Sequence, residues 1–500
     1  MDKDSVLIHI LKSKGTPTLL GGDLPFRVIN DNKYISPLSA EGEVREENLP
    51  TVDQAIHTAL SGENKTVILI GSEGSGKTTT VEKLVVDWAK GVHLQNFEYV
   101  FHFRFKDLNA CEDALSLETL IQRCHHYFPP QSMHLVLQKP EDVLVVFDGL
   151  NESLNRGITT ELDLSYSRLG DEKFKILCTG LRDCKIQELC LQSCNLTEES
   201  CEDLVSVLTS GTSQLCLLVM SFNKIGDQGF AKLCDALHSP HCKLQELKLD
   251  RCDLTEASMK VFSAALRSGQ SELKKVILAR NTMDDSGVEA LCVSLQHPLC
   301  KLQSLNLYTC QLTGACCSHL KEALMSEYCT LSELELSVNE LGQEGALLLC
   351  QALRRPGCPL EKLGLTRCEL TRPVFEELGS VLKSGTSQLK SLSVGLNKVG
   401  DQGVKHLWDA VAHPSCLLEE LDVEMTQLTN ACVEDLCTAI RASKTLKKLE
   451  MRNNSLTDAS IPALVQVMQD SHGMQEMNLK YNDFSEDLFE MLEKCTKIIY

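Results

Sequence analysis

One short apolar pattern, L-x-x-L-x-L-x-x-(N/C)-x-L, recurs about twelve times in the last two-thirds of the chain, mostly 29 residues apart. A degenerate first copy begins at Thr159. The first apolar residues of the later copies are Ile186, Leu215, Leu244, Leu273, Leu302, Leu331, Leu360, Leu389, Leu418, Leu446 and Met474. A fixed period of this length indicates a stack of similar supersecondary units. Because a single unit leaves its apolar face uncovered, its neighbours must cover it, and the pattern predicts a solenoid.

The variable (N/C) position alternates between two residue types. Each type recurs every 58 residues, as Cys194, Cys252, Cys310 and Cys368 and as Asn223, Asn281, Asn339 and Asn397. The building block is therefore a pair of units. We expect the small Cys side chain to meet the backbone of a neighbouring coil. We expect the Asn side chain to hydrogen-bond backbone groups that would otherwise be buried without partners.

Within one unit, the residue spacing predicts a short strand followed by a helix. Leu247 and Leu249 are two residues apart and point to one side of a strand. Thr255 is the expected N-cap of a helix over 256–267, and Ser268-Gly269 is expected to end that helix. The residues predicted to face the core at helical spacing are Met259, Phe262, Ala265 and Leu266.

Alternating units of 28 and 29 residues with Cys or Asn in the ladder resemble leucine-rich repeats of the ribonuclease-inhibitor class. The resemblance covers residues 158–488 and implies an α/β horseshoe, with a parallel sheet inside and helices outside. Residues 489–500 are then a C-terminal cap or tail. Polar side chains between the strand leucines give a mildly acidic inner face suited to a protein partner rather than a small molecule. They include Asp163, Lys248, Asn306, Glu335, Asp422 and Glu450.

Charge and cysteine content limit the function further. A net charge of −20 argues against a reader of duplex DNA and favours basic or mixed partners. No apolar run approaches the roughly 18 residues of a membrane span, and the first residues do not form a secretory signal. The 24 cysteines fall mostly at repeat-locked positions without a C-x-x-C pair. They are therefore interpreted as reduced thiols of a cytoplasmic protein rather than as disulfides or zinc ligands.

Two residue pairs allow a chemical as well as a structural interpretation. Cys316-Cys317 is interpreted as helix packing, with redox chemistry as the alternative. His125-His126 has no acid or cysteine at ligand spacing. It is interpreted as a surface loop, with metal binding as the alternative.

A phosphate-binding motif lies ahead of the repeats. Residues 66–70 are predicted to form a buried strand, and the next eight residues, Gly71-Ser-Glu-Gly-Ser-Gly-Lys77-Thr78, satisfy G-x-x-x-x-G-K-[ST]. A helix is predicted over 79–90, with Val81, Leu84, Val85 and Trp88 on one face. Backbone N–H groups of the glycine loop and the helix N-terminus would bind phosphate oxygens. The expected phosphate-binding residues are Gly71, Gly74, Ser75, Gly76, Lys77, Thr78 and Thr79, with Thr78 as a Mg²⁺ ligand; a chance glycine turn is the alternative.

An acidic residue ends a second predicted strand, residues 143–147 followed by Asp148. Together with the glycine loop, this corner resembles the NACHT module of the NLR family (nucleotide-binding, leucine-rich-repeat receptors). The resemblance extends to Trp88–Gly91, Phe97–Phe101 and Phe105–Leu108. It implies ATP or ADP with Mg²⁺ as ligand, with Asp148 supporting Mg²⁺. It also implies that Glu152 polarises the attacking water, although Glu152 could instead cap the turn.

The chain departs from a complete NACHT module in two places. Asn151 replaces the usual second acid, and only residues 153–157 separate this corner from the first repeat. The further strands, sensor arginine, helical and winged-helix segments of that family are therefore missing between them. We expect residues 1–60 to be an irregular N-terminal region or linker and residues 61–157 to be a partial P-loop module. We expect this module to bind nucleotide without efficient hydrolysis; the oligomeric state stays open.

Three functions follow from these features. The first is an NLR-like cytosolic sensor or regulator, whose horseshoe binds a protein or other ligand and whose NACHT segment binds ATP or ADP. The resemblance implies a role in innate immune signalling. The second is a module like ribonuclease inhibitor that sequesters a basic protein without nucleotide switching. Against it, the strand positions lack a dense aromatic and acidic cluster near the C-terminal end. The third is a nucleotide hydrolase.

Overall fold

The computed structural model describes residues 18–19, 22–23, 77–92, 94–95, 97–104, 121–122, 125, 143–148, 161–167, 169–182 and 184–500. Backbone contacts divide the chain into two compact units. One comprises residues 1–162, 172–188 and 210–214, and the other comprises residues 163–171, 189–209 and 215–500.

The repeats build one parallel sheet of 13 strands in the order of the chain, from β5 to β17. The strands are β5 (Glu161–Asp163), β6 (Glu188–Cys190), β7 (Leu217–Val219), β8 (Glu246–Lys248), β9 (Lys275–Ile277), β10 (Ser304–Asn306), β11 (Glu333–Glu335), β12 (Lys362–Gly364), β13 (Ser391–Ser393), β14 (Glu420–Asp422), β15 (Lys448–Glu450), β16 (Glu476–Asn478) and β17 (Ile498–Ile499). Each strand is short because the chain must leave the sheet again to form the helix of the same coil.

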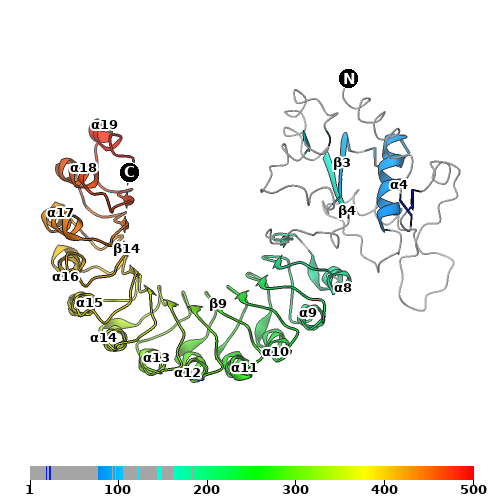
Figure 1. The fold of residues 1–500 in the computed structure, drawn as a ribbon, viewed down its shortest axis with the longest axis horizontal. Coiled ribbons are helices and arrows are strands. Elements are labelled where there is room, and N and C mark those ends of the chain that lie inside the picture. The colour runs from blue at the N-terminus through cyan, green and yellow to red at the C-terminus, as the bar shows by residue number, and fades with distance from the viewer. Residues whose placement is uncertain are drawn as a thin grey trace. The chain divides into compact units, whose positions relative to one another are not determined.

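Helices connect the strands on the opposite side of each coil. They are α8 (Gly170–Leu181), α9 (Ser200–Leu208), α10 (Gly226–Ala236), α11 (Glu256–Arg267), α12 (Asp284–Leu295), α13 (Cys316–Leu324), α14 (Gly342–Leu353), α15 (Arg372–Lys383), α16 (Gly400–Val411), α17 (Val433–Ala442), α18 (Ile461–Asp470) and α19 (Phe489–Leu492), with 3-10 turns at Asn430–Cys432, Asp458–Ser460 and Glu486–Leu488. The array curves with its strands inside and its helices outside (Figure 1). This confirms the predicted α/β horseshoe.

The central residue of each strand lies in one buried row. Leu247, Val276, Leu305 and Leu334 are register partners on successive strands and are at most 1% exposed. The apolar core therefore runs as a continuous layer between the sheet and the helices. Burying each row requires the coils on both sides, as the repeat period predicts.

The helix α11 agrees with its sequence prediction. Thr255 has an extended backbone, and its side chain accepts a hydrogen bond from the backbone N–H of Ala257. The helix ends at Arg267, and Gly269 follows with φ of +76°. The four residues predicted to face the core, Met259, Phe262, Ala265 and Leu266, are all buried.

The Asn and Cys ladder also forms as predicted. Oδ1 of Asn281 accepts from the backbone N–H groups of Cys252 and Leu254, at 2.9 and 3.1 Å. Its Nδ2 donates to the carbonyl oxygens of Leu249 and Leu278, both at 2.8 Å. The Cys252 thiol donates to the carbonyl oxygen of the preceding coil at Met220. Each ladder residue thus satisfies polar backbone groups that water does not reach.

Cysteine packing agrees with the helix interpretation of Cys316-Cys317. Both side chains are buried in α13, and the described cysteines are all free thiols. Near the end of the array Thr426 takes the ladder position, fully buried, and donates its hydroxyl to the carbonyl oxygen of Val423 at 2.9 Å. A small hydroxyl side chain thus replaces the thiol as the donor in this coil.

The N-terminal unit contains fewer described elements. Strands β3 (Tyr99–Arg104) and β4 (Val143–Asp148) pair in parallel, and α4 (Lys77–Ala89) is the helix after the glycine loop. Strand β1 (Thr18–Leu19) pairs antiparallel with β2 (Gly22–Asp23). The helix begins two residues before the predicted start, and Val81 is half-buried while Leu84, Val85 and Trp88 are buried. The predicted strand over 66–70 lies outside the described residues.

The interpretation of His125 as a surface residue was wrong. Its side chain is only 6% exposed. Its ring lies 5.5 Å from the ring of Phe101 and 5.0 Å from that of Phe103, between ring centroids. Two aromatic rings on β3 form an apolar surface that this imidazole covers, a feature that residue spacing does not reveal. Within the described part of the chain, no group of three metal-binding side chains comes together, and no helix is long and apolar enough to cross a membrane.

Candidate functional site

The inner face of the repeat sheet presents two rows of side chains. The strand-start row consists of the first residue of each strand from β8 to β16: Glu246, Lys275, Ser304, Glu333, Lys362, Ser391, Glu420, Lys448 and Glu476. The strand-end row consists of the third residue of the same strands: Lys248, Ile277, Asn306, Glu335, Gly364, Ser393, Asp422, Glu450 and Asn478. Because successive strand residues alternate in direction, both rows point away from the buried central leucines. We call this surface the strand face.

Ion pairs between adjacent coils largely neutralise the strand-start row. The ammonium nitrogen of Lys275 lies 3.2 Å from Glu246, that of Lys362 lies 2.8 Å from Glu333, and that of Lys448 lies 3.7 Å from Glu420. The hydrogen bond from Lys362 lowers the pKa of Glu333. Opposite charges at directly facing positions of neighbouring strands stabilise the sheet modestly and leave little net charge on this row.

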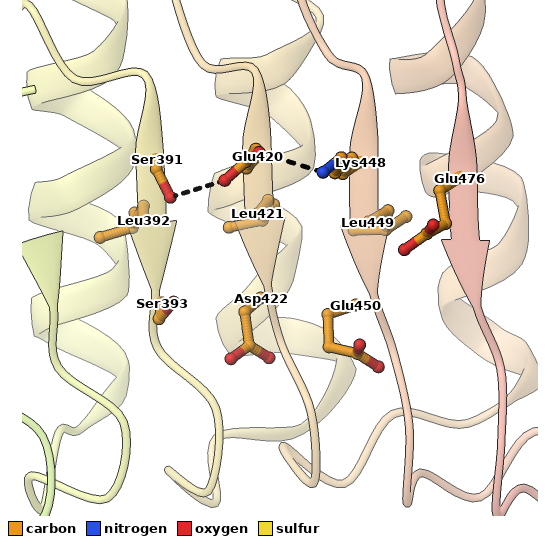
Figure 2. A pocket seen from close by; sticks show the side chains of 10 residues that line it. All are labelled: Ser391, Leu392, Ser393, Glu420, Leu421, Asp422, Lys448, Leu449, Glu450 and Glu476. Atoms are coloured by element: carbon orange, nitrogen blue, oxygen red, sulfur yellow. Dashed lines mark hydrogen bonds and ion pairs between the residues drawn. The ribbon is translucent and has the colours of Figure 1, made fainter. Parts of the chain in front are cut away.

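The strand-end row is acidic toward its C-terminal end. Asp422 and Glu450 are adjacent there and point the same way (Figure 2). Burial, together with the nearby carboxylates Glu424 and Glu450, raises the pKa of Asp422 to about 6. Arg452 is the cation beside them, with Nε 2.9 Å from Glu450 and a terminal nitrogen 2.8 Å from Glu424. One arginine therefore faces three carboxylates.

The sequence predicted no dense aromatic and acidic cluster at the strand positions near the C-terminal end. The structure shows an acidic group there without aromatic residues. The structure brings Asp422, Glu424 and Glu450 together from two neighbouring coils. Glu424 lies two residues beyond β14, outside the strand positions that the pattern marks. Aligning the two coils at their 28-residue offset, and extending the alignment to the positions just after each strand, would have revealed Glu424 as part of this group. The residues that line the nearby hollow include no aromatic side chain.

Small side chains hollow the strand face between its acidic residues. Gly364 occupies the strand-end row on β12, and Ser391 and Ser393 occupy the two rows on β13. A hollow of about 290 Å³ over β9–β13 and another of about 190 Å³ over β13–β16 share these two serines. A Cβ atom at Gly364 would collide with the carboxylate of Glu335, which lies over this glycine. The carboxylate of Glu335 therefore covers Gly364, and the face is low over the two serines of β13.

The other predicted inner-face residues also lie on the strand positions. Lys248 pairs with Glu246 at 3.3 Å. Asn306 accepts from the backbone N–H of Tyr308 at 2.9 Å through Oδ1. Asp163 accepts in the same way from the backbone N–H of Ser165 at 2.8 Å. These local bonds fix the direction of each side chain and so preorganise the face.

Part of the predicted nucleotide site lies on described elements. Lys77, Thr78 and Thr79 are the first three residues of α4, and Asp148 is the last residue of β4. Gly71, Gly74, Ser75, Gly76 and Glu152 lie outside the described residues. The helix begins at Lys77, and a helix N-terminus at this position is what the predicted phosphate site requires. The strand that ends at Asp148 supplies the backbone position at which the sequence predicts a Mg²⁺-supporting acid.

Comparison with known proteins shows two kinds of relationship. The family model described as NACHT domain matches residues 65–159. The model described as leucine-rich repeat matches residues 271–292, 329–350 and 388–407. The nucleotide motif and the repeats are thus recognised separately.

Relatives match mainly over the repeats. The chain is 36% identical over 309 residues to mouse ribonuclease inhibitor, covering 61% of this chain and 67% of that protein. It is 36% identical over 326 residues to human NACHT, LRR and PYD domains-containing protein 12, covering 64% of this chain and 30% of that protein. An internalin structure from Listeria monocytogenes aligns with a TM-score of 0.37 at 17% identity, covering 74% of this chain and 92% of that one.

The matches to these two relatives cover different shares of the relatives' own lengths. The chain spans less than a third of the length of the human NACHT, LRR and PYD protein but two-thirds of ribonuclease inhibitor. The parallel sheet, the Asn and Cys ladder and the NACHT match occur together in one chain. The chain therefore belongs to the leucine-rich-repeat proteins of the ribonuclease-inhibitor type, and the NACHT segment ahead of its repeats fits an NLR-like protein.

Proposed function

We propose that this chain is a cytoplasmic regulator in innate immune signalling. In this proposal, the strand face binds a protein partner and the NACHT segment binds ATP or ADP. The observation that carries the protein-binding part is the strand face itself. Its two rows of outward side chains are held in register on one continuous sheet. Such a surface meets a partner with little ordering cost, because the sheet already fixes the positions of the side chains.

The dimensions of the strand face favour a macromolecule over a small molecule. Thirteen strands at about 4.8 Å each extend about 58 Å between the outermost strands. A stable protein interface needs about 800 Å² on each partner, which a face of this length can supply. The two hollows, of about 190 and 290 Å³, are smaller than a typical ligand pocket of about 300–1,000 Å³.

The nucleotide part is supported by the NACHT match over residues 65–159 and by the start of α4 at Lys77. In the proposal, Lys77 contacts the β- and γ-phosphates, and Thr78 and Asp148 support Mg²⁺. A bound Mg²⁺ would neutralise phosphate charge. Glu152 is the candidate for orienting water. Because Asn151 stands where the family has an acid, we propose binding with little turnover.

A photo-crosslinking experiment tests the protein-binding part. A photoreactive amino acid is placed at Asn306 on the strand face or at the exposed Glu376 on α15 as a matched control. We expect a discrete crosslinked partner only from the Asn306 position in cells. Crosslinks of equal yield and identity from both positions, or none from Asn306, would remove the strand face as the binding surface.

Titration with a fluorescent ATP analogue tests the nucleotide part. We expect saturable binding to the wild-type chain and a marked loss in Lys77→Ala, because that ammonium is the principal phosphate contact. Circular dichroism of both proteins checks that the helix still forms. Equal binding by the two proteins, or binding by neither, refutes nucleotide recognition at this site.

A second candidate function is sequestration of a basic protein without nucleotide switching. It is favoured by the carboxylates around Asp422 and by the similarity to ribonuclease inhibitor over two-thirds of that protein. Its test is inhibition of a basic pancreatic-type ribonuclease at low salt. Absence of inhibition at micromolar concentrations of the chain excludes this candidate and leaves the first proposal standing.

A further inference from the structure

We propose that the repeat array has a hinge at one junction between coils, where α14 meets α15. At this junction, the turns between the strand ends and the helix starts, which we call the loop edge, can separate. The junction is marked by Gln343 and Thr371. This inference goes beyond the proposed function, because it concerns the free chain and needs no partner.

A carboxylate connects the starts of successive helices at four equivalent junctions. Each carboxylate belongs to the second residue of its helix and accepts hydrogen bonds from the backbone N–H and the hydroxyl of the threonine ahead of the next helix. These residues are Asp171, Asp227, Asp285 and Asp401. In the repeats that the structure describes, Gln343 takes this position on α14, and its Oε1 accepts from the hydroxyl of Thr371 alone, at 2.7 Å. Because hydrogen bonds to a carboxylate are about twice as strong as those between neutral groups, this junction is held more weakly than the other four.

The helix cap at the junction is weaker as well. At the equivalent residues Thr255, Thr313 and Thr429, the side-chain oxygen accepts from the backbone N–H two residues further on. Two residues after Thr371 the chain has Pro373, which carries no N–H. Helix α15 accordingly begins without a side-chain cap. The residue types at 343 and 373 thus remove two contacts from one turn.

A backbone contact with the following coil is missing at the same place. In the four equivalent coils, one backbone N–H donates to the preceding coil at 2.8 or 2.9 Å, from Lys224, Thr282, Glu340 and Ser455. Lys398 takes this position after Thr371, and no protein group accepts from its backbone N–H among the described residues. Thr371 is therefore joined less firmly to both neighbouring coils than its four counterparts are.

The helices on either side of the junction pack tightly away from it. A Cβ atom at Gly345 on α14 would lie 2.7 Å from the Cα atom of Gly314, ahead of α13. A Cβ atom at Gly379 on α15 would lie 2.5 Å from the carbonyl oxygen of His406 on α16. Such close packing resists sliding. Since α14 is held against the coil before it and α15 against the helix after it, we expect movement between α14 and α15.

Two sets of contacts keep the halves joined while the loop edge opens. Strands β11, β12 and β13 pair in full register, and Oδ1 of Asn397 accepts from the backbone N–H of Cys368 at 3.1 Å. At the other end of α14, Arg354 donates to Ser380 at 2.8 Å and lies 2.7 Å from Glu377, both on α15. The sheet and these side chains form the pivot. Opening at the loop edge would let the strand face change its curvature to match a partner.

Hydrogen exchange of the full chain, measured by mass spectrometry with fragmentation to single residues, tests the opening. Val374 and its counterpart Cys316 each donate a backbone hydrogen bond to the threonine at the start of their own helix. We expect a protection factor about tenfold lower at Val374, because only the threonine ahead of Cys316 is held by a carboxylate. Gln343→Asp should raise protection at Val374 about tenfold, and Asp285→Gln should lower it at Cys316 by a similar factor. The control Glu344→Gln, at an exposed position of α14, should change neither.

A distance measurement tests whether this opening bends the array. Spin labels are introduced as non-canonical amino acids, because the chain has 24 cysteines that would react with thiol labels. Gln311 and Gln427 are exposed, lie four coils apart and flank the junction, whereas Lys224 and Glu340 are exposed, lie four coils apart and do not. We expect a broader distance distribution for the first pair by electron–electron double resonance. Gln343→Asp should narrow this distribution to the width of the second pair.

Equal protection at Val374 and Cys316 would overturn the inference, and so would protection at Val374 that Gln343→Asp leaves unchanged. Faster exchange at Val374 with equal distance distributions for the two label pairs would show fraying of one turn without a hinge, which also overturns it. Thermal unfolding midpoints show whether each variant keeps its fold. The Asn306 crosslink and the nucleotide titration are independent of these results, so the proposed function stands or fails separately.

Discussion

Replacing a ladder asparagine is the sharpest test of how the coils are joined. Asn281 is 3% exposed. In Asn281→Ala, the backbone N–H groups of Cys252 and Leu254 lose the oxygen that accepts their hydrogen bonds at 2.9 and 3.1 Å. The carbonyl oxygens of Leu249 and Leu278 lose donors at 2.8 Å. This one side chain thus connects its own coil to the preceding one.

The loss of unfolding free energy in Asn281→Ala follows from the two backbone N–H groups that are left without an acceptor. Leaving one buried donor unsatisfied costs about 1–3 kcal/mol, so the pair costs about 2–6 kcal/mol. The carbonyl oxygens add less, because each has a second lone pair for other donors. Since each coil contacts only its neighbours, the loss should appear first as local opening around these coils. Hydrogen exchange measured by mass spectrometry should therefore accelerate at Cys252 and Leu254 before it does in distant coils.

Asn306→Ala is the matched control. This half-exposed asparagine on the strand face accepts one bond, from the backbone N–H of Tyr308. Because water can replace that acceptor, we expect the unfolding free energy measured in urea to fall by less than about 1 kcal/mol. Asn281 does not join the coils as inferred if Asn281→Ala destabilises the chain no more than Asn306→Ala does. Exchange at Cys252 and Leu254 that stays as slow as in the wild-type chain would refute this role as well.

Three further predictions concern other parts of the chain. Asp227→Ala removes a contact between coils, in which the carboxylate accepts hydrogen bonds from the backbone N–H and the hydroxyl of Thr255 at 2.8 and 2.6 Å. The unfolding free energy measured in urea should fall by about 1–3 kcal/mol. The control Asp235→Ala, at an exposed position of the same helix, should change it very little. Burial raises the pKa of Cys252 to about 12. The contribution of this thiol to the unfolding free energy should therefore be lost as pH rises from about 9 toward 12, where the unfolded chain releases the thiol proton first. An unfolding free energy that stays flat over this pH range contradicts this. Phosphate release from ATP should be slow in the wild-type chain and unchanged in Glu152→Gln, whereas a large drop in the variant would identify a working hydrolase.

Sequence reasoning predicted the repeat unit in detail because local rules dominate there. The bounds of α11, the cap at Thr255 and the left-handed Gly269 follow from residue chemistry within one coil. The strand β4 ends at Asp148 as predicted, since a run of apolar residues followed by an acid marks the end of a buried strand. Contacts between coils were harder to predict. The hydrogen bonds from Thr255 to Asp227 were not predicted, because these two residues lie 28 positions apart on neighbouring coils.

The sequence by itself determined the period, the alternating Cys and Asn ladder, and the strand and helix within each coil. These depend on spacing and on the hydrogen-bonding capacity of single residues. The tertiary structure alone decided which carboxylates meet on the strand face and how high the pKa of Asp422 is raised. It also decided that His125 is buried against Phe101 and Phe103. Burial and electrostatic coupling depend on neighbours from other coils or strands, whose distances are fixed only when the chain has folded.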